Sequence, residues 1–377
     1  MQRYKHILLT TGLIIVCVAL VCISVKIYAN AVSAGILTKK DELKVVVPIV
    51  DIPKTFRGMG ENILHDESNS LATVFKKLRK IRKAQLSNNI LEISSYTSEP
   101  KDTLRVLHIG DSHIRGHVYP RTVKDMLAEC FGSIVYRDFG INGATCNSYL
   151  NSRTMQQICT YTSEQEDNPL LAQSGGSPFE IKDNGTEDKS VGDKKSDNQI
   201  FHGDIIAKHH KPDLIILSFG TNESYGRYYN ADEHYKQIDA LVKALNEAFP
   251  GTPLLLTTPT GCYKAHRTSY KTRVLVSNGR HSKHGRKSRR YKTVTRTRTT
   301  YSENPFNAPC AATIVKYAKD NNLAYWDLYT ISGGRESACR NWTSAGLMRA
   351  DHVHFIPEGY TLQGQLLYCA LIKEYNK

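Results

Sequence analysis

The sequence predicts an α/β protein built on a parallel β-sheet of five strands, with helices on both faces of the sheet. Two observations lead to this prediction. From residue 104 to the C-terminus, short apolar runs alternate with segments of helical periodicity, which is typical of a parallel sheet. Several apolar runs also end directly in glycine and polar residues, and the carboxyl ends of strands are where such a sheet forms its functional site.

The elements follow from these patterns in order along the chain. The predicted strands are the apolar runs 104–109, 134–139, 214–219, 254–258 and 323–328. The predicted helices are 71–81, 121–130, 233–249, 311–320 and a last one from Pro357 to about Tyr375. Proline at the first helical position favours the start of this last helix. The run 214–219 is the most apolar, so we expect it at the centre of the sheet.

Composition and charge exclude several classes of protein. The chain has 377 residues, of which 40% are hydrophobic, so it is neither mostly disordered nor collagen-like. The formal net charge is +14, but residues 264–300 hold thirteen Lys or Arg and no acid, which leaves 14 − 13 = +1 elsewhere. The body of the protein is therefore nearly neutral and carries one basic insertion.

The N-terminus predicts export. A short basic start is followed by residues 7–25, which contain no charged side chain, and then by the small residues Ala29 and Ala31. Residues 1–31 are therefore expected to be a signal peptide cleaved after Ala31 or an uncleaved membrane anchor. We expect a protein of the periplasm or cell envelope, held at the inner membrane by residues 7–25 if cleavage does not occur.

The rest of the chain is expected to form one domain with a lead-in and two insertions. Residues 32–100 are predicted to be a stalk and a lead-in helix, and residues 101–377 the domain itself. The first insertion, at about 161–204, is polar and is predicted to be a long loop. The second, at about 264–304, is basic, and Cys262 and Cys310 flank it, so that a disulfide at its base is one option.

The basic insertion also bears on function. Its alternating Thr and Arg residues fit either a β-hairpin arm or a solvated loop. A basic run indicates an anionic partner. Because an exported protein rarely meets nucleic acid, we expect an anionic envelope polymer and no nucleic acid. A non-catalytic module that binds such a polymer is therefore one candidate function for the chain.

Four short segments carry residues suited to acyl transfer. Ser112 lies in Gly-Asp-Ser-His after the first predicted strand, where a tight turn exposes a nucleophile. Asn222 follows the central strand and can donate to an oxyanion, as can the backbone N–H of Gly143 after the second strand. Asp351 and His354 are three residues apart on one loop, so the carboxylate can orient the imidazole that takes the serine proton.

With these segments the chain resembles the SGNH/GDSL hydrolases, above all the bacterial cell-envelope branch that includes peptidoglycan O-acetylesterases. The resemblance covers residues 101–377 apart from the two insertions. It implies a three-layer α/β/α sandwich of flavodoxin-like topology. It also implies an exported serine esterase that removes acetyl or another small acyl group from envelope or other carbohydrate, with no metal or cofactor.

The resemblance also implies roles for single residues. Ser112, Asp351 and His354 would form the catalytic triad, and Ser112, Gly143 and Asn222 the oxyanion hole. The chain departs from the common family pattern in two places, with His113 for Leu and Glu223 for Asp. The residues expected to bind substrate beside the triad are Asp111, His113, Glu223 and Tyr225.

Two other enzymes remain as alternatives. A carbohydrate O-acetyltransferase would use the same triad, with a sugar acceptor in place of water. A metallophosphoesterase would use Asp111-x-His113 and His352-x-His354, but it also needs a second bridging Asp and an Asn-His pair. Ala207 and Glu223 stand where those ligands should be, which argues against a two-metal site.

Overall fold

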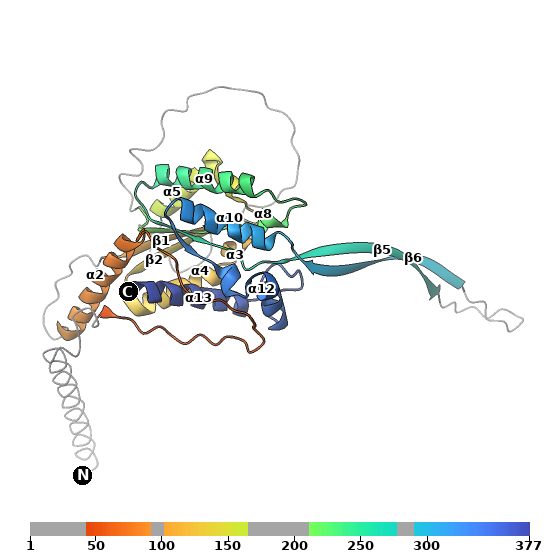
Figure 1. Cartoon of the computed structure of the whole chain (residues 1–377), viewed down its shortest axis with the longest axis horizontal. Coiled ribbons are helices and arrows are strands. Elements are labelled where there is room, and N and C mark those ends of the chain that lie inside the picture. Colours follow the sequence, from red (N-terminus) through yellow and green to blue (C-terminus); the bar gives the residue numbers. More distant parts are fainter. Residues whose placement is uncertain (1–42, 92–101, 165–210, 277–289) are drawn as a thin grey trace, which may run out of the picture.

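A computed structural model describes residues 43–91, 102–164, 211–276 and 290–377, and it confirms the predicted fold class. The centre is a parallel five-stranded sheet in the order β2-β1-β3-β4-β7 (Figure 1). Its strands are β1 (Leu104–Gly110), β2 (Ile134–Gly140), β3 (Leu214–Ser218), β4 (Leu254–Thr257) and β7 (Ala324–Trp326). The most apolar predicted strand, β3, lies in the middle of the sheet, as expected.

Helices cover both faces of the sheet, because alternate strand residues point to opposite sides. Val106 and Ile216 belong to a core with α2, α4 and α13, whereas Leu107 and Ile215 belong to a second core with α5, α9 and α10. These helices are α2 (Ala72–Leu91), α4 (Val118–Phe131), α5 (Ser152–Glu164), α9 (Ala231–Ala248), α10 (Asn307–Asp320) and α13 (Pro357–Tyr375). Two shorter helices, α11 (Leu328–Ile331) and α12 (Gly334–Ser344), follow β7. The result is the expected three-layer sandwich.

The segment predicted to be a stalk differs from that expectation from residue 43 onward, because it packs on the domain. Val45, Phe56 and Leu64 are buried in the same core as α13. The residues between them are exposed or only partly buried in no regular order, so the sequence lacks the periodicity of a helix or strand. An extended chain that inserts isolated apolar side chains over a helix gives no regular pattern.

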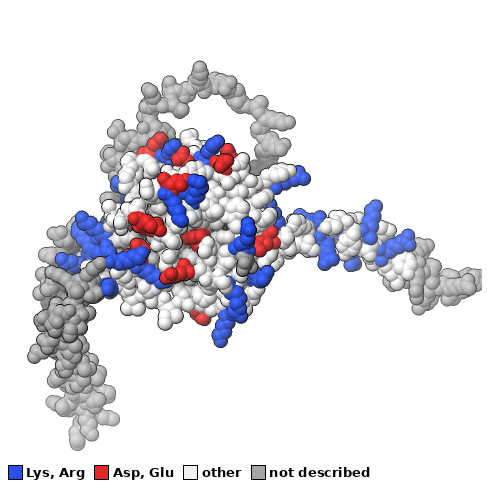
Figure 2. All heavy atoms as spheres, in the orientation of Figure 1, with Lys and Arg blue, Asp and Glu red and all other residues white. Residues whose placement is uncertain are grey.

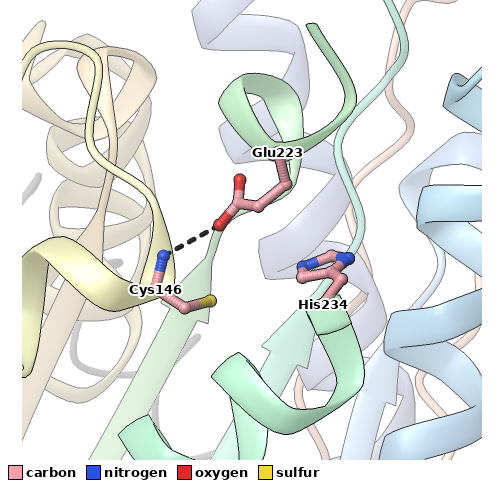
Figure 3. A group of neighbouring side chains, drawn as sticks. All are labelled: Cys146, Glu223 and His234. Atoms are coloured by element: carbon pink, nitrogen blue, oxygen red, sulfur yellow. Dashed lines mark hydrogen bonds between the residues drawn. The ribbon is translucent and has the colours of Figure 1, made fainter. Parts of the chain in front are cut away.

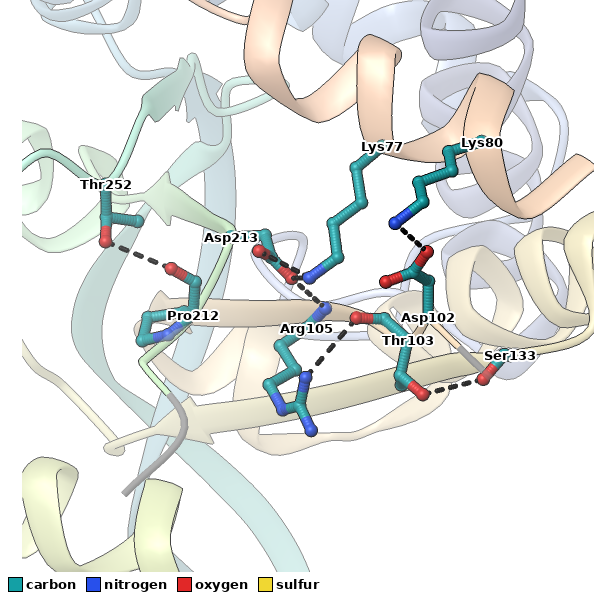
Figure 4. A network of polar contacts seen from close by, with 9 residues as sticks. All are labelled: Lys77, Lys80, Asp102, Thr103, Arg105, Ser133, Pro212, Asp213 and Thr252. Atoms are coloured by element: carbon teal, nitrogen blue, oxygen red, sulfur yellow. Dashed lines mark hydrogen bonds and ion pairs between the residues drawn. The ribbon is translucent and has the colours of Figure 1, made fainter. Parts of the chain in front are cut away.

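Helix α2, which follows this segment, is held by charges at the amino ends of the central strands (Figure 4). Lys77 Nζ contacts both carboxylate oxygens of Asp213, at 2.8 and 2.7 Å. The same carboxylate accepts a hydrogen bond from the backbone N–H of Arg105 at 2.8 Å. The lead-in helix is thus fixed to the sheet edge opposite the carboxyl ends of the strands.

The basic insertion is a β-hairpin, which confirms one of the two forms expected for it. Strands β5 (Tyr263–Val276) and β6 (Arg290–Glu303) pair antiparallel and project from the sandwich as an arm (Figure 1). Lys and Arg residues lie along the arm (Figure 2), four in β5 and four in β6, against the single acid Glu303. Cys262 and Cys310 are free thiols, so the disulfide considered for the base of the arm is not formed.

Several sequence predictions lie outside the described residues. They are the N-terminal segment with its Ala31 site, most of the polar first insertion, and residues 277–289 of the basic insertion. Within the part of the chain that the structure describes, no helix is both long and apolar enough to cross a membrane.

Candidate active site

Ser112 is the first residue of the short helix α3 (Ser112–Arg115), directly after β1. The Asp111 side chain caps this helix by accepting the backbone N–H of His113 at 2.9 Å. The helix lies so close to the strands that only glycine fits beneath it. A Cβ on Gly140 would meet the backbone nitrogen of Arg115 at 2.2 Å. The close contact holds the serine at the carboxyl end of the sheet.

The structure brings Ser112, His354 and Asp351 together as one hydrogen-bonded chain, although 242 residues separate the first two. Ser112 Oγ lies 2.9 Å from His354 Nε2, and His354 Nδ1 lies 2.8 Å from Asp351 Oδ2. The other carboxylate oxygen accepts the backbone N–H groups of Val353 and His354, at 2.9 and 3.0 Å. Burial alone would raise the pKa of Asp351, but these hydrogen bonds and the His354 ring hold it below its usual value.

The loop that carries Asp351 and His354 is fixed from two sides. Arg349 donates its backbone N–H to the His354 carbonyl at 2.8 Å and its Nε to the Phe355 carbonyl at 3.0 Å. No sequence pattern had indicated Arg349. On the other side, the His352 ring lies 4.2 Å from the Tyr301 ring and 5.5 Å from the Tyr263 ring, between centroids.

The base of the basic hairpin therefore supports the loop that carries Asp351 and His354. Tyr263 donates its backbone N–H to the His352 carbonyl at 3.0 Å, and the Tyr301 hydroxyl donates to the Ala350 carbonyl at 3.0 Å. His352 has a φ of 56°, an uncommon conformation for a residue other than glycine. The contacts with both hairpin strands stabilise that turn, so His352 has a structural role.

The three expected oxyanion donors lie on neighbouring loops at the carboxyl ends of β1, β2 and β3. Asn222 is in α8 (Thr221–Tyr225), and its Nδ2 donates to the Ala144 carbonyl at 2.9 Å, which ties it to the Gly143 loop. Gly143 has a φ of +69°, a turn that favours glycine. Among the described residues, no hydrogen bond is donated by the backbone N–H of Ser112 or of Gly143. These groups are thus available to an incoming oxyanion.

Glu223 joins the two loops instead of facing a substrate. Its Oε1 accepts the backbone N–H of Cys146 at 2.8 Å, and its Oε2 accepts the backbone N–H of Gly220 at 3.0 Å. Burial raises the pKa of this carboxyl to about 6. The expected substrate contact is therefore replaced by a structural one, which keeps Asn222 and the Gly143 loop in register.

Asp111 and His113 are also turned inward. Burial raises the pKa of the helix-capping Asp111 to about 7. His113 Nδ1 pairs with the Tyr360 hydroxyl at 3.0 Å, and its burial, together with the nearby His354, lowers its pKa to about 3. His113 therefore packs as a neutral ring against His354, 5.2 Å away between centroids. Of the four expected substrate contacts, only Tyr225 has an exposed side chain.

A cavity of about 30 Å³ lies beneath the serine turn, lined by Asp111, His113 and threonines of the β4 loop among others. It has room for water but not for an acyl group, and Ser112 does not line it. The metallophosphoesterase alternative fails on this geometry. Among the described residues, the metal-ligand combination Asp111, His113, His352 and His354 does not converge, since His352 packs between tyrosines.

The arrangement is suited to acyl transfer. The imidazole can accept the serine proton through Nε2 while Asp351 holds Nδ1–H, which keeps the ring in the required tautomer and stabilises the imidazolium that forms. The backbone N–H groups of Ser112 and Gly143, which have no acceptor among the described residues, are the kind of donor that stabilises negative charge on a carbonyl oxygen under attack.

Comparisons with known proteins identify the family and support the fold. A family model of GDSL-like lipases and acylhydrolases matches residues 106–367, more than half of the chain. Among solved structures, one described as a peptidoglycan O-acetylesterase in action is 14% identical, with a TM-score of 0.50, covering 83% of this chain and 99% of that one.

Two further solved structures show a weaker likeness. A putative acylhydrolase from Bacteroides fragilis is 14% identical with a TM-score of 0.34, covering 78% of this chain and 97% of its own. A putative platelet activating factor from Streptococcus pneumonia is 16% identical with a TM-score of 0.36, covering 80% and 94%. No curated protein matches the chain in sequence. The matched family model covers the strands, the serine turn and the histidine loop, so the chain belongs to the GDSL-like lipase/acylhydrolase family and is a carboxylic ester hydrolase.

Proposed function

We propose that this esterase removes acetyl groups from an O-acetylated glycan by a two-step mechanism on Ser112. The observation that carries the proposal is the hydrogen-bonded chain from Ser112 Oγ through His354 to Asp351. In the first step the Oγ–H proton passes to His354 Nε2 as Oγ bonds to the acetyl carbon. The proton then goes to the sugar oxygen, which leaves as the alcohol, and an acetyl-serine remains.

The second step regenerates the enzyme. A water molecule gives a proton to His354 Nε2 as its oxygen bonds to the acetyl carbon. The acyl–Oγ bond then breaks, His354 returns the proton to Ser112 Oγ, and acetate is released. In both steps the backbone N–H groups of Ser112 and Gly143 and the Asn222 amide stabilise the oxyanion. Loss of one such donor costs about 10²–10³ in rate in known cases.

Acetate release tests this mechanism. Purified O-acetylated peptidoglycan and O-acetylated xylan serve as substrates for the wild type and for Ser112→Ala. We expect acetate from the wild type and a loss of at least about 10³ in rate for the variant. A variant with near-normal activity would exclude Ser112 as the nucleophile. The ratio of the two substrates identifies the preferred glycan.

The same acetyl-serine can pass its acetyl group to a sugar hydroxyl, so an O-acetyltransferase is the second candidate. The two differ only in whether water or sugar accepts the acyl group in the second step. Incubation with an acetyl donor and an unacetylated glycan separates them, because only a transferase yields acetylated glycan. Acetate as the sole product favours the esterase.

The hairpin arm supports an anionic polymer as the substrate or its carrier. Its two strands carry eight basic side chains and one acid, and most of the residues described there are exposed. Charges along an arm whose base touches the histidine loop can hold a polymer whose ester enters the site. If so, KM for acetylated peptidoglycan rises with salt and on replacement of Arg296 and Arg298 by Gln, while kcat for a small acetate ester is unchanged.

Location follows from the N-terminal sequence pattern. We infer an exported enzyme of the periplasm or cell envelope, held by residues 7–25 if the leader is retained. Fractionation of cells and N-terminal sequencing of the mature protein test this. A new N-terminus at Val32 indicates cleavage, the full-length protein in inner membranes indicates an anchor, and a protein found only in the cytoplasm overturns export.

A further inference from the structure

Behind the oxyanion loops, three side chains from three elements meet away from the Ser112 relay (Figure 3). Cys146 begins the short helix η2 (Cys146–Tyr149), Glu223 lies in α8, and His234 lies in the first turns of α9. A sulfur, a carboxylate oxygen and an imidazole nitrogen of this group all lie within 4.8 Å of one another. None of the three is used by the proposed mechanism.

Hydrogen bonds around His234 determine which ring nitrogen carries the proton. The Pro309 carbonyl can only accept, so the Thr313 hydroxyl donates to it, at 2.9 Å. Thr313 Oγ1 must then accept from the Tyr229 hydroxyl at 2.8 Å, and the Tyr229 oxygen accepts from His234 Nδ1 at 2.9 Å. The Nδ1 proton is therefore the one that His234 holds, and Nε2 presents a lone pair.

This lone pair is buried without a donor. His234 is 2% exposed, and its Nε2 has no hydrogen-bond partner among the residues that the structure describes. The imidazole faces the Cys146 thiol and the Glu223 carboxylate (Figure 3). Both oxygens of that carboxylate accept hydrogen bonds from backbone N–H groups. The sulfur, the carboxylate and the imidazole Nε2 thus each present lone pairs to the others, and the thiol hydrogen is the one hydrogen that these three groups can share. Buried polar groups in this state usually have a missing partner, such as a water or an ion.

We propose that Cys146 Sγ, a Glu223 carboxylate oxygen and His234 Nε2 bind a zinc ion. Sulfur, imidazole nitrogen and carboxylate oxygen are the ligands that zinc takes in proteins, at about 2.0–2.3 Å. Ligand atoms of a tetrahedral site are then about 3.3–3.7 Å apart. The three ligand atoms now lie within 4.8 Å of one another, so they have to approach each other by about 1 Å to reach these distances. On binding, the Cys146 thiol releases its proton to solvent, and the fourth position takes a water.

The surroundings of the site suit a bound cation. A divalent ion stabilises a thiolate and a carboxylate that would otherwise be buried without a positive partner. The Tyr229 hydroxyl that accepts from Nδ1 is the kind of outer partner that zinc-bound histidines usually have.

Zinc in this position would support the active site without touching substrate. Glu223 follows Asn222 directly, and Cys146 lies three residues after Gly143, so the ion would connect both oxyanion loops to α9. We expect it to stabilise the fold and to position these two donors. Because Ser112 is not a ligand, Ser112→Ala should bind zinc as the wild type does, which separates this proposal from the proposed esterase mechanism.

Metal content is the direct test. The full chain is stripped with a chelator, given zinc chloride, dialysed, and analysed for bound metal, with Cys146→Ala and His234→Gln beside the wild type. Cys369→Ala is the matched control, because it removes a buried thiol on α13. We expect one equivalent more zinc in the wild type and the control than in the two variants. Zinc at about 100 times Kd should raise the wild-type Tm by about 3–5 °C.

Cobalt gives a readout that does not depend on the stability of a variant. Bound to the wild type, Co²⁺ should show a thiolate-to-cobalt charge-transfer band, and Cys369→Ala should retain it. Equal zinc content in the wild type and Cys146→Ala would overturn the proposal, as would the absence of the thiolate band in the wild type. A Tm that zinc does not change would do the same.

Discussion

Replacement of Asp351 by Asn should disable the relay while leaving its shape intact. The Asp351 oxygen that accepts the backbone N–H groups of Val353 and His354, at 2.9 and 3.0 Å, has to remain an oxygen. The new amide is thereby oriented, and its NH2 group takes the place of the oxygen now 2.8 Å from His354 Nδ1. The imidazole must then present a lone pair at Nδ1 and carry its proton on Nε2. In that tautomer it cannot take the proton of Ser112.

The size of the effect follows from the tautomer. A relay in which the ring holds its proton on the wrong nitrogen loses about 10³–10⁴ in kcat, or about 4–5.5 kcal/mol of transition-state stabilisation. KM for a small ester should change little, because Asp351 does not contact the acyl group. The Tm should change by no more than about 2 °C, since the two backbone hydrogen bonds remain.

Hydrolysis of p-nitrophenyl acetate at pH 7.5 measures this loss, with Ser112→Ala as the background rate. Asp232→Asn removes the same charge from the first turn of α9, far from the relay in sequence, and should leave kcat unchanged. The double variant Ser112→Ala/Asp351→Asn should be no slower than Ser112→Ala alone. A loss of less than tenfold for Asp351→Asn would refute the tautomer argument and assign orientation of His354 to another group.

Three further predictions concern the scaffold. Gly140→Ala places a Cβ 2.2 Å from the backbone of α3, so we expect the free energy of unfolding in urea to fall by about 1–3 kcal/mol and kcat to fall as well. Gly116→Ala is the control. Its Cβ would meet no neighbouring atom closer than 3.7 Å, so the free energy of unfolding should change by less than about 0.5 kcal/mol. Lys77→Met leaves Asp213 without its ion pair and should cost about 1 kcal/mol in the same assay. The pKa of Asp351 is lowered in the folded state, so its carboxylate stabilises the fold above its unfolded pKa, and this contribution is lost as the pH falls through the folded pKa. The urea midpoint should therefore fall more steeply below about pH 4 in the wild type than in Asp351→Asn.

The relay could be predicted from the sequence because parallel strands bring their carboxyl ends to one edge. Ser112 follows β1 and Asn222 follows β3, and these strands pair with Gly110 opposite Ser218. Short motifs at the ends of adjacent strands must therefore meet, however far apart they are along the chain. His354 precedes α13, whose first residue Pro357 marks its start in the sequence.

The direction of single side chains could not be predicted in the same way. Glu223 reaches the backbone of Cys146 because the chain turns at Gly220, which has a φ of 122°. His113 points inward because its Nδ1 forms a hydrogen bond with the Tyr360 hydroxyl. The orientation of each side chain depends on a partner from another part of the fold. A sequence motif identifies the residue but not this partner. The same holds for residues 43–71, whose buried side chains pack on elements far along the chain, as Phe56 packs on Trp342 of α12.

The position of the basic hairpin explains how a nearly neutral hydrolase can carry a strongly charged insertion without loss of its fold. The arm leaves the sandwich after β4, at the same sheet edge as Ser112 and Asn222, where loops vary without disturbing the core. A two-stranded hairpin alone is marginally stable in water, and this one is anchored by the contacts of Tyr263 and Tyr301 with the His352 turn. The loop that anchors the hairpin is therefore also the loop that carries Asp351 and His354. Shortening the arm beyond these tyrosines should leave kcat for small esters unchanged, whereas Tyr301→Ala should lower it, because only the second change releases the loop that carries His354.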